Sequence, residues 1–179
     1  MSNEAVIVDR AKPDDANELG DVAAATFPMA CPPESTPEDI AAFIAEVLSP
    51  NRFQDYLADP ARTVLKALAD EKIIGYALLN TAEPADPDVA KVIELRPITE
   101  LSKMYVLAGH HGNGVSAALM QAALDSARED GSAGVWLGVN QKNARAQRFY
   151  GKHGFQIVGT KTFMVGSQQH HDYVMQLEF

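Results

Sequence analysis

Residues 107–120 read LAGHHGNGVSAALM, with three glycines and two adjacent histidines between an apolar stretch and a series of small helix-forming residues. The pattern predicts a strand that ends near residue 107 and a helix that begins near Gly114. Glycine at the start of a helix lets backbone N–H groups approach a ligand closely, and a helix N-terminus favours an anion, most often a phosphate. The sequence therefore predicts a strand, a phosphate-binding loop and a helix in succession.

Three interpretations of this loop compete. A P-loop requires Gly-Lys-Ser/Thr, and no Lys follows Gly114. The dinucleotide-binding pattern G-x-G-x-x-G/A fits Gly112, Gly114 and Ala117, but Val106 lies six positions before Gly112 and the next strand ends in Asn140 instead of an acidic residue. The P-loop and the dinucleotide interpretation therefore both fail, and a glycine-rich turn without a ligand is the third interpretation, which stays open.

The segments on both sides of the loop predict a mixture of strands and helices. The expected strands cover residues 5–10, the two halves of 63–80 around an Asp-Glu-Lys turn, 94–107 with an interruption at Pro97, 133–140, and a closing hairpin over 156–179 whose turn spans 166–172. The expected helices cover 12–27, 36–49, a short turn within 51–60, 114–130 and 143–153. Prolines predict a loop over 27–38, because proline cannot continue a helix. The order predicts an α/β (α+β) chain whose first half is mostly antiparallel.

Composition limits the class of protein. With 179 residues, of which 46% are hydrophobic and 22% charged, the chain fits one globular domain over residues 1–179. Its formal net charge of −9 argues against nucleic acid or an anionic membrane as the main partner, and suits a cationic substrate or simply solubility. The single cysteine, Cys31, excludes an intramolecular disulfide. With no signal-peptide pattern and no apolar run of about 18 residues, we expect a cytoplasmic protein.

A second motif lies at residues 143–155, NARAQRFYGKHGF, where Asn143 and Gly154 mark the start and the end of a helix. It fits N-x-x-A-x-x-x-Y-x-x-x-G-F in full. Together with ELSKMYV, the glycine-rich loop and VWLGVN, it resembles the GNAT superfamily of acyl-CoA-dependent N-acetyltransferases over nearly the whole chain. The C-terminal third is similar to the bacterial spermidine/spermine acetyltransferases, which share the WLGV strand, the FY-x-K-x-GF helix and a terminal hairpin.

The resemblance implies a single GNAT-like domain with a mixed, mostly antiparallel central sheet, flanked by helices and splayed between the strands at 98–107 and 133–140. The pantetheine arm of acetyl-CoA would lie in this gap. The family's pyrophosphate loop, Gln/Arg-x-x-Gly-x-Gly/Ala, would fall on His111, Gly114 and Ser116, where two of the three positions depart from the pattern. The residues that the resemblance assigns to acetyl-CoA are Met104, Tyr105, Val106, His111, Gly112, Asn113, Gly114, Val115, Ser116, Asn140, Asn143 and Ala146.

Acetyl transfer to an amine needs a base for the amine and an acid for the leaving thiolate. The resemblance places the base at Glu100 and the acid at Tyr150, since a phenol has an ordinary pKa of about 10 and keeps its proton at neutral pH. Strict alternation would put Glu100 on one strand face with Ser102, Met104 and Val106, unless a bulge intervenes. An exposed strand carboxylate and a packing aromatic ring are the structural alternatives for Glu100 and Tyr150.

Other conspicuous residues predict less. The histidines of His110–His111 and of His170–His171 are adjacent in sequence and do not match the spacing of a known metal site, so we expect no bound metal. Trp136 is expected in the core. Cys31 lies in the proline-rich loop, which in this family lines the acceptor pocket.

The sequence as a whole predicts an N-acetyltransferase that uses acetyl-CoA and acts on a small-molecule primary amine, with spermidine or spermine as the first expectation. Acidic residues in loops expected beside the acceptor cleft suit a polycation; they are Glu34, Glu38, Asp39, Glu83, Asp86 and Asp88. An amino acid, a peptide N-terminus or an aminoglycoside-type amine is the alternative acceptor, and a non-catalytic acyl-CoA-binding module is the alternative class. A homodimer is a family-level expectation.

Overall fold

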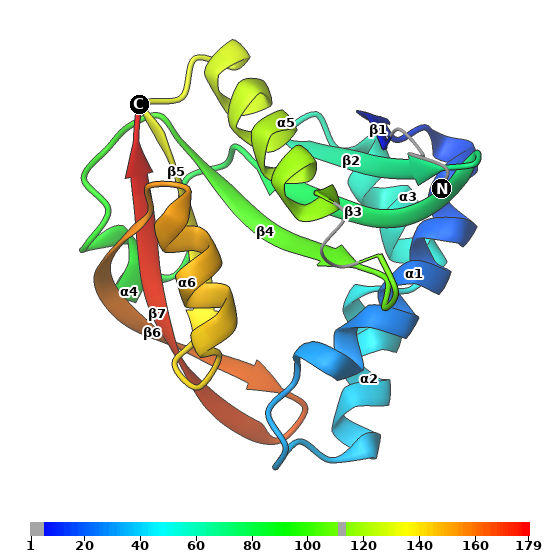
Figure 1. The fold of residues 1–179 in the computed structure, drawn as a ribbon. Coiled ribbons are helices and arrows are strands. Elements are labelled where there is room, and N and C mark those ends of the chain that lie inside the picture. Colours follow the sequence, from blue (N-terminus) through cyan, green and yellow to red (C-terminus); the bar gives the residue numbers. More distant parts are fainter. Residues whose placement is uncertain (1–5, 111–113) are drawn as a thin grey trace.

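A seven-stranded sheet in the order β1-β2-β3-β4-β5-β7-β6 forms the centre of the computed structural model, which describes residues 6–110 and 114–179 (Figure 1). Its strands are β1 (Ile7–Arg10), β2 (Arg62–Ala69), β3 (Lys72–Asn80), β4 (Ile98–Val106), β5 (Gly134–Asn140), β6 (Gln156–Val165) and β7 (Gln168–Glu178). Neighbouring strands are antiparallel, except for β4 and β5, which are parallel. The prediction of a mixed, mostly antiparallel sheet is confirmed.

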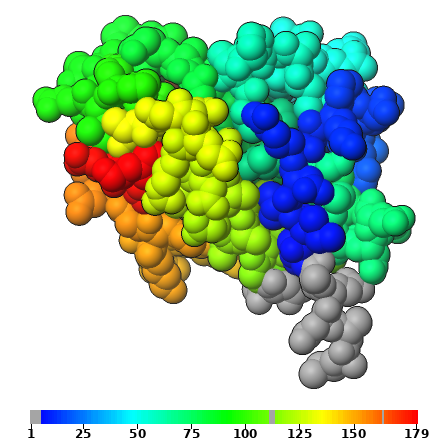
Figure 2. Space-filling model, turned by 90° about the horizontal axis from the view of Figure 1, so that it is seen from above, coloured from blue at the N-terminus to red at the C-terminus, as the bar shows by residue number. Residues whose placement is uncertain are grey.

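Helices cover both faces of the sheet. The helical elements are the 3-10 helix η1 (Pro13–Asp15), α1 (Ala16–Ala30), α2 (Pro37–Val47), α3 (Pro50–Ala58), α4 (Pro87–Ala90), α5 (Val115–Glu129) and α6 (Ala144–Lys152). The first three α-helices pack on one face, around Tyr76 and Leu78 of β3, and α5 and α6 pack on the other, around Ala77 and Leu79. Seen from above, α5 runs between the N-terminal segment and the end of β7 (Figure 2). None of the described helices is long and apolar enough to cross a membrane.

Local sequence signals explain where three of the helices begin. The side chains of Thr36, Ser49 and Asn143 accept hydrogen bonds from backbone N–H groups of the first turn of α2, α3 and α6, at 3.1, 3.3 and 3.0 Å. Such caps satisfy N–H groups that have no partner within the helix. Pro37 and Pro50 occupy the first helical positions of α2 and α3, where proline loses no hydrogen bond.

The predicted loop over 27–38 begins four residues too early, because α1 continues through Pro28 to Ala30. A proline in the last turn of a helix removes a single hydrogen bond, the one to the carbonyl four residues earlier. Phe27 stacks on Phe43 of α2 with the ring centroids 4.5 Å apart and the planes at 14°, and this packing holds the last turn in place.

The closing hairpin has a shorter turn than predicted. Its turn is Gly166–Ser167, and β7 begins at Gln168, so most of the predicted 166–172 turn is strand. Ser167 N–H donates to the Asp39 carboxylate of α2 at 3.3 Å, which ties the hairpin tip to that helix. The acidic connection over 82–93 also holds the short helix α4, which the sequence did not predict.

The sheet opens between β4 and β5. The two strands pair over Ile98–Glu100 and Gly134–Trp136. Over the rest of its described length β4 stays paired with β3, and β5 stays paired with β7. The predicted gap between these strands is therefore present. Trp136, at its closed end, is buried in the core as expected.

A β-bulge in β4 shifts the side chains that face this gap. Leu78 of β3 pairs with Lys103, and the next residue, Leu79, pairs with Leu101. Ser102 is therefore the extra residue, and the alternation of side chains between the two sheet faces restarts after it.

Because of the bulge, Glu100 shares its sheet face with other residues than the sequence predicted. Lys103 and Tyr105, and not the expected Met104 and Val106, line the same cavity as Glu100. The side chains of Met104 and Val106 pack with the core beneath α5. The prediction of strict alternation is wrong because an inserted residue reverses the facing of every later residue in the strand.

Candidate active site

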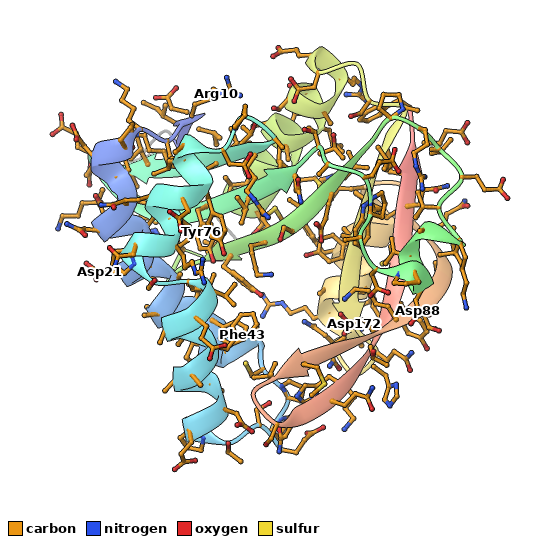
Figure 3. All side chains as sticks on the ribbon, turned by 180° about the vertical axis from the view of Figure 1, so that it is seen from behind. Arg10, Asp21, Phe43, Tyr76, Asp88 and Asp172 are labelled. Atoms are coloured by element: carbon orange, nitrogen blue, oxygen red, sulfur yellow. The ribbon has the colours of Figure 1, made fainter. Side chains whose placement is uncertain are left out.

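Two adjoining cavities lie at the gap between β4 and β5. The larger, of about 460 Å³, is bounded by the end of α1, by β4, and by the starts of α5 and α6. The smaller, of about 160 Å³, is bounded by β4, β5, α6, the β6–β7 hairpin and the segment after α1. Figure 3 shows the side chains between β4 and the hairpin from behind, with Asp172 labelled. The residues that line both cavities are Ala30, Tyr105, Asn143, Ala146 and Tyr150.

Most of the residues assigned to acetyl-CoA line these cavities. The larger cavity is lined by Met104, Tyr105, Val106, Gly114, Ser116, Asn143 and Ala146. Asn140 lines the smaller one. The Val115 side chain is buried in the core, so only its backbone could reach a ligand. The assignments to His111, Gly112 and Asn113 lie outside the described residues.

The start of α5 is suited to an anion. Gly114 caps the helix in the left-handed conformation, with φ at +76°, and offers no capping side chain. The first helical hydrogen bond runs from Ala118 N–H to the Gly114 carbonyl at 2.9 Å, so the N–H groups of residues 115–117 have no acceptor within the helix. Because Gly114 and Ser116 line the larger cavity, these donors and the positive end of the helix dipole lie at its edge.

Arg145 is a candidate binding residue that the sequence reasoning missed. It is an exposed residue in the first turn of α6 and lines the larger cavity together with Gly114 and Ser116. A guanidinium is always charged and suits phosphate oxygens. The sequence could have indicated Arg145 by its position inside the NARAQRFYGKHGF motif, but the motif pattern allows any residue at that position.

Tyr150 stands at the boundary of the two cavities. Its ring packs edge-on against Phe149 and Phe155, with centroids 5.6 and 6.0 Å away. Gly154, with φ at +99°, ends this segment and lets the chain turn into β6. Burial raises the pKa of the Tyr150 phenol to about 12, so the hydroxyl keeps its proton throughout the physiological range.

Glu100 sits where the sheet opens, opposite Trp136 in the last β4–β5 pair, and lines the smaller cavity. Burial raises the pKa of its carboxyl above the ordinary value of 4.5, while the positive charges of Lys103 and Lys161 oppose the shift. A carboxylate with a raised pKa is a stronger base than an exposed one. The structure therefore places Glu100 in the cavity wall and not on an exposed strand face.

Charged residues that the sequence did not single out as site residues complete the smaller cavity. Lys161 of β6 and Asp172 of β7 form a buried ion pair at 3.3 Å. The lysine side chain crosses Gly138 of β5, where a Cβ atom would lie 2.5 Å from Lys161 Cε. Lys103 and the buried His170 line the same cavity, as does Cys31 in the loop after α1.

The chain matches the sequence model of the Acetyltransferase (GNAT) family over residues 23–155. This span includes β4, the start of α5 and the whole of α6. The chain belongs to the GNAT acetyltransferase family. The predicted GNAT fold and the predicted acyltransferase class are thereby confirmed.

Relatives of this GNAT acetyltransferase occur at several levels of similarity. An uncharacterized N-acetyltransferase of Mycobacterium tuberculosis is 51% identical over 164 residues, which are 92% of this chain and 97% of the relative. Streptothricin acetyltransferase of Streptomyces lavendulae is 31% identical over 99 residues, 55% of this chain and 47% of that protein. The crystal structure of the PaiA N-acetyltransferase from Thermoplasma acidophilum in complex with coenzyme A has a TM-score of 0.77 at 18% identity, covering 98% of this chain and 99% of that one.

Three of the six acidic residues expected beside the acceptor cleft have local partners outside the smaller cavity of this GNAT acetyltransferase. Glu34 forms an ion pair with Lys142, Glu83 pairs with Arg96 at 2.7 Å, and Asp39 accepts hydrogen bonds from the hairpin tip. The described lining of the smaller cavity includes none of the six loop acids named above. The cavity that faces Glu100 is therefore not acidic overall.

Proposed function

We propose that this GNAT acetyltransferase transfers the acetyl group of acetyl-CoA to a primary amine bound in the smaller cavity. The observation that carries the proposal is the meeting of the two cavities at Tyr150, inside the gap between β4 and β5. One cavity is bordered by anion-binding groups and the other by a buried carboxylate. The coenzyme A bound to the Thermoplasma acidophilum protein supports the choice of acyl donor.

The larger cavity offers the contacts that acetyl-CoA needs. The N–H groups at the start of α5 and the Arg145 guanidinium would bind phosphate oxygens. The β4 backbone from Leu101 to Val106 has β3 on one side, and its other side faces the opening from β5. Its peptide groups on that side can pair with the amides of the pantetheine arm, which would lie there like an added strand.

The reaction moves one acetyl group and one net proton. The neutral amine nitrogen attacks the thioester carbonyl carbon, the C–N bond forms, and the C–S bond breaks. Glu100 takes the proton that the ammonium form of the amine loses, directly or through a water molecule, and passes it to solvent. The acylated nitrogen then loses its second proton to solvent, Tyr150 gives its own proton to the leaving sulfur, and the phenol regains a proton from solvent, so that one net proton is released. The products are an N-acetyl amide and coenzyme A with a free thiol.

A free-thiol assay with acetyl-CoA tests the proposal against a panel of primary amines. The panel holds spermidine, spermine, α-amino acids, a short peptide and an aminoglycoside, with mass spectrometry of each product. We expect thiol release that depends on the amine and yields an acetylated product. Spermidine and spermine are included because the C-terminal third resembles polyamine acetyltransferases. Tight binding of coenzyme A with no turnover of any amine would favour a non-catalytic acyl-CoA-binding module.

A further inference from the structure

The smaller cavity is lined by charged residues of both signs. Asp172 and Lys161 are joined at 3.3 Å and are 8% and 12% exposed. Glu100 and Lys103 stand on either side of the bulge in β4 and face the same cavity. A cavity that holds two carboxylates and two ammonium groups complements a ligand with both a positive and a negative charge.

Lys103 of β4 is one of the residues that line the smaller cavity. Lys103 Nζ donates to the Ser102 carbonyl at 3.2 Å and lies 5.9 Å from the centre of the Phe43 ring on α2. Burial lowers the pKa of Lys103, and Glu100 acts in the opposite direction. Taking an ammonium out of water is costly unless anionic or polar groups surround it. A bound carboxylate would add a further anionic neighbour to this ammonium.

His170 adds a second polar group to the same cavity. It is 6% exposed, and its Nε2 atom has no hydrogen-bond partner among the described residues. Buried polar atoms in proteins are nearly always hydrogen bonded to protein, water or ligand. Because His170 also lines the smaller cavity, its imidazole is a further polar group in the wall beside the acceptor.

We infer that the acceptor carries a carboxylate beside its amine, as an α-amino acid does, and that Lys103 binds this carboxylate while Glu100 faces the amine. The inference rests on the proposed acetyl transfer to an amine. The volume of about 160 Å³ suits such a small molecule, since a cavity of about 150 Å³ holds benzene. A polyamine would instead bring further positive charge toward Lys103 and Lys161, which is unfavourable.

Matched acceptors test the inference: α-amino acids of several side-chain sizes, each compared with its own carboxamide. The carboxamide keeps the amine and the shape and loses the negative charge. We compare pH-independent kcat/KM values, because the amine of the carboxamide is less basic. We expect the wild-type protein to prefer the best acid over its amide by roughly 10- to 100-fold, the usual effect of a hydrogen bond to a charged group.

Three variants assign the preference to Lys103. Lys103→Met should remove most of it by raising KM for the acid, and Lys103→Arg should restore part of it. Lys152→Met, which changes an exposed lysine at the end of α6, should leave it intact. Equal kcat/KM for acid and amide in the wild type, an unchanged preference in Lys103→Met, or higher kcat/KM for spermidine than for every amino acid would overturn the inference.

A binding measurement separates this inference from the proposed function. Calorimetry of the wild-type protein with coenzyme A present compares N-acetyl-alanine with N-acetyl-alaninamide, and needs neither turnover nor a variant. Tighter binding of the acid supports the inference, and equal binding contradicts it. Turnover of amines without any preference for a carboxylate refutes only the inference. Absence of turnover for every amine refutes the proposed function.

Discussion

Replacing Tyr150 by Phe tests the assignment of the acid. The change removes one hydroxyl group and keeps the ring that packs against Phe149 and Phe155. The free energy of unfolding should change by about 1 kcal/mol or less, the net value of one ordinary hydrogen bond. The affinity for coenzyme A should change little, because the phenylalanine ring still lines the larger cavity, while the phosphates would bind at the start of α5 and at Arg145 and the pantetheine along β4.

Turnover, in contrast, should fall strongly. A positioned general acid contributes roughly 10²- to 10⁴-fold, so kcat should drop by at least about 10²-fold, equivalent to about 2.7 kcal/mol in the barrier. The pKa of Tyr150 is about 12, so only about one phenol in 10⁴ is ionised at pH 8. The ratio of wild-type to variant kcat should therefore stay constant between pH 6 and pH 9.

The assay combines steady-state thiol release with calorimetry of coenzyme A binding and a thermal melt. Tyr76→Phe is the matched control, because Tyr76 is fully buried in the core below α1 and α3 and its hydroxyl has no partner among the described residues. That variant should keep full activity. A folded Tyr150→Phe protein with wild-type kcat would exclude Tyr150 as the acid and leave it as a packing residue.

Three further changes test the other groups. Glu100→Gln should lower kcat by roughly 10²-fold and abolish the loss of activity at acid pH. In the wild-type protein that loss should occur above pH 4.5, because the raised pKa means that the Glu100 carboxylate is already protonated at a higher pH than an exposed glutamate. A loss of activity at acid pH that survives in the variant would assign it to another group. Gly114→Val should weaken coenzyme A binding by filling the mouth of the larger cavity. Gly131, just beyond the other end of α5, also has a positive φ (+82°) and no atom within 4 Å of an added Cβ, so Gly131→Val should cost a similar backbone strain of about 1–2 kcal/mol and leave binding unchanged. Arg145→Met should weaken coenzyme A binding by about 10-fold, the effect of one charge-assisted hydrogen bond, and an unchanged affinity measured by calorimetry would exclude a phosphate contact.

Elements with strong local signals were predictable from the sequence. The helix over 143–153 has an asparagine cap, a terminal glycine and a family motif, and the structure places Tyr150 at the junction of the two cavities. The strands around the Asp-Glu-Lys turn and the helix after the glycine-rich loop were also predicted, because alternation and helical periodicity are properties of short segments.

The features that the sequence did not predict depend on distant residues. The bulge at Ser102 arises from the register between β3 and β4, and single-strand alternation carries no trace of it. Lys161 and Asp172 meet only because the β6–β7 hairpin pairs them. Strand residues that face a polar cavity are themselves polar, so the segment lacks the hydrophobic alternation that predicts a strand and is predicted as a loop. Pro28 led to a wrong prediction of where α1 ends, because the packing of Phe27 against Phe43 outweighs the one hydrogen bond that the proline removes.

The most direct test of the central claim follows the acetyl group itself. Acetyl-CoA with an isotopic label in its acetyl group is incubated with the protein and the amine panel, and the label and the free thiol are quantified together. We expect the label to appear in an amide of one amine, in equal amount to the thiol released, and Tyr150→Phe to slow both equally. Thiol release with the label found only in free acetate, or no transfer by a protein that binds coenzyme A, would contradict this claim.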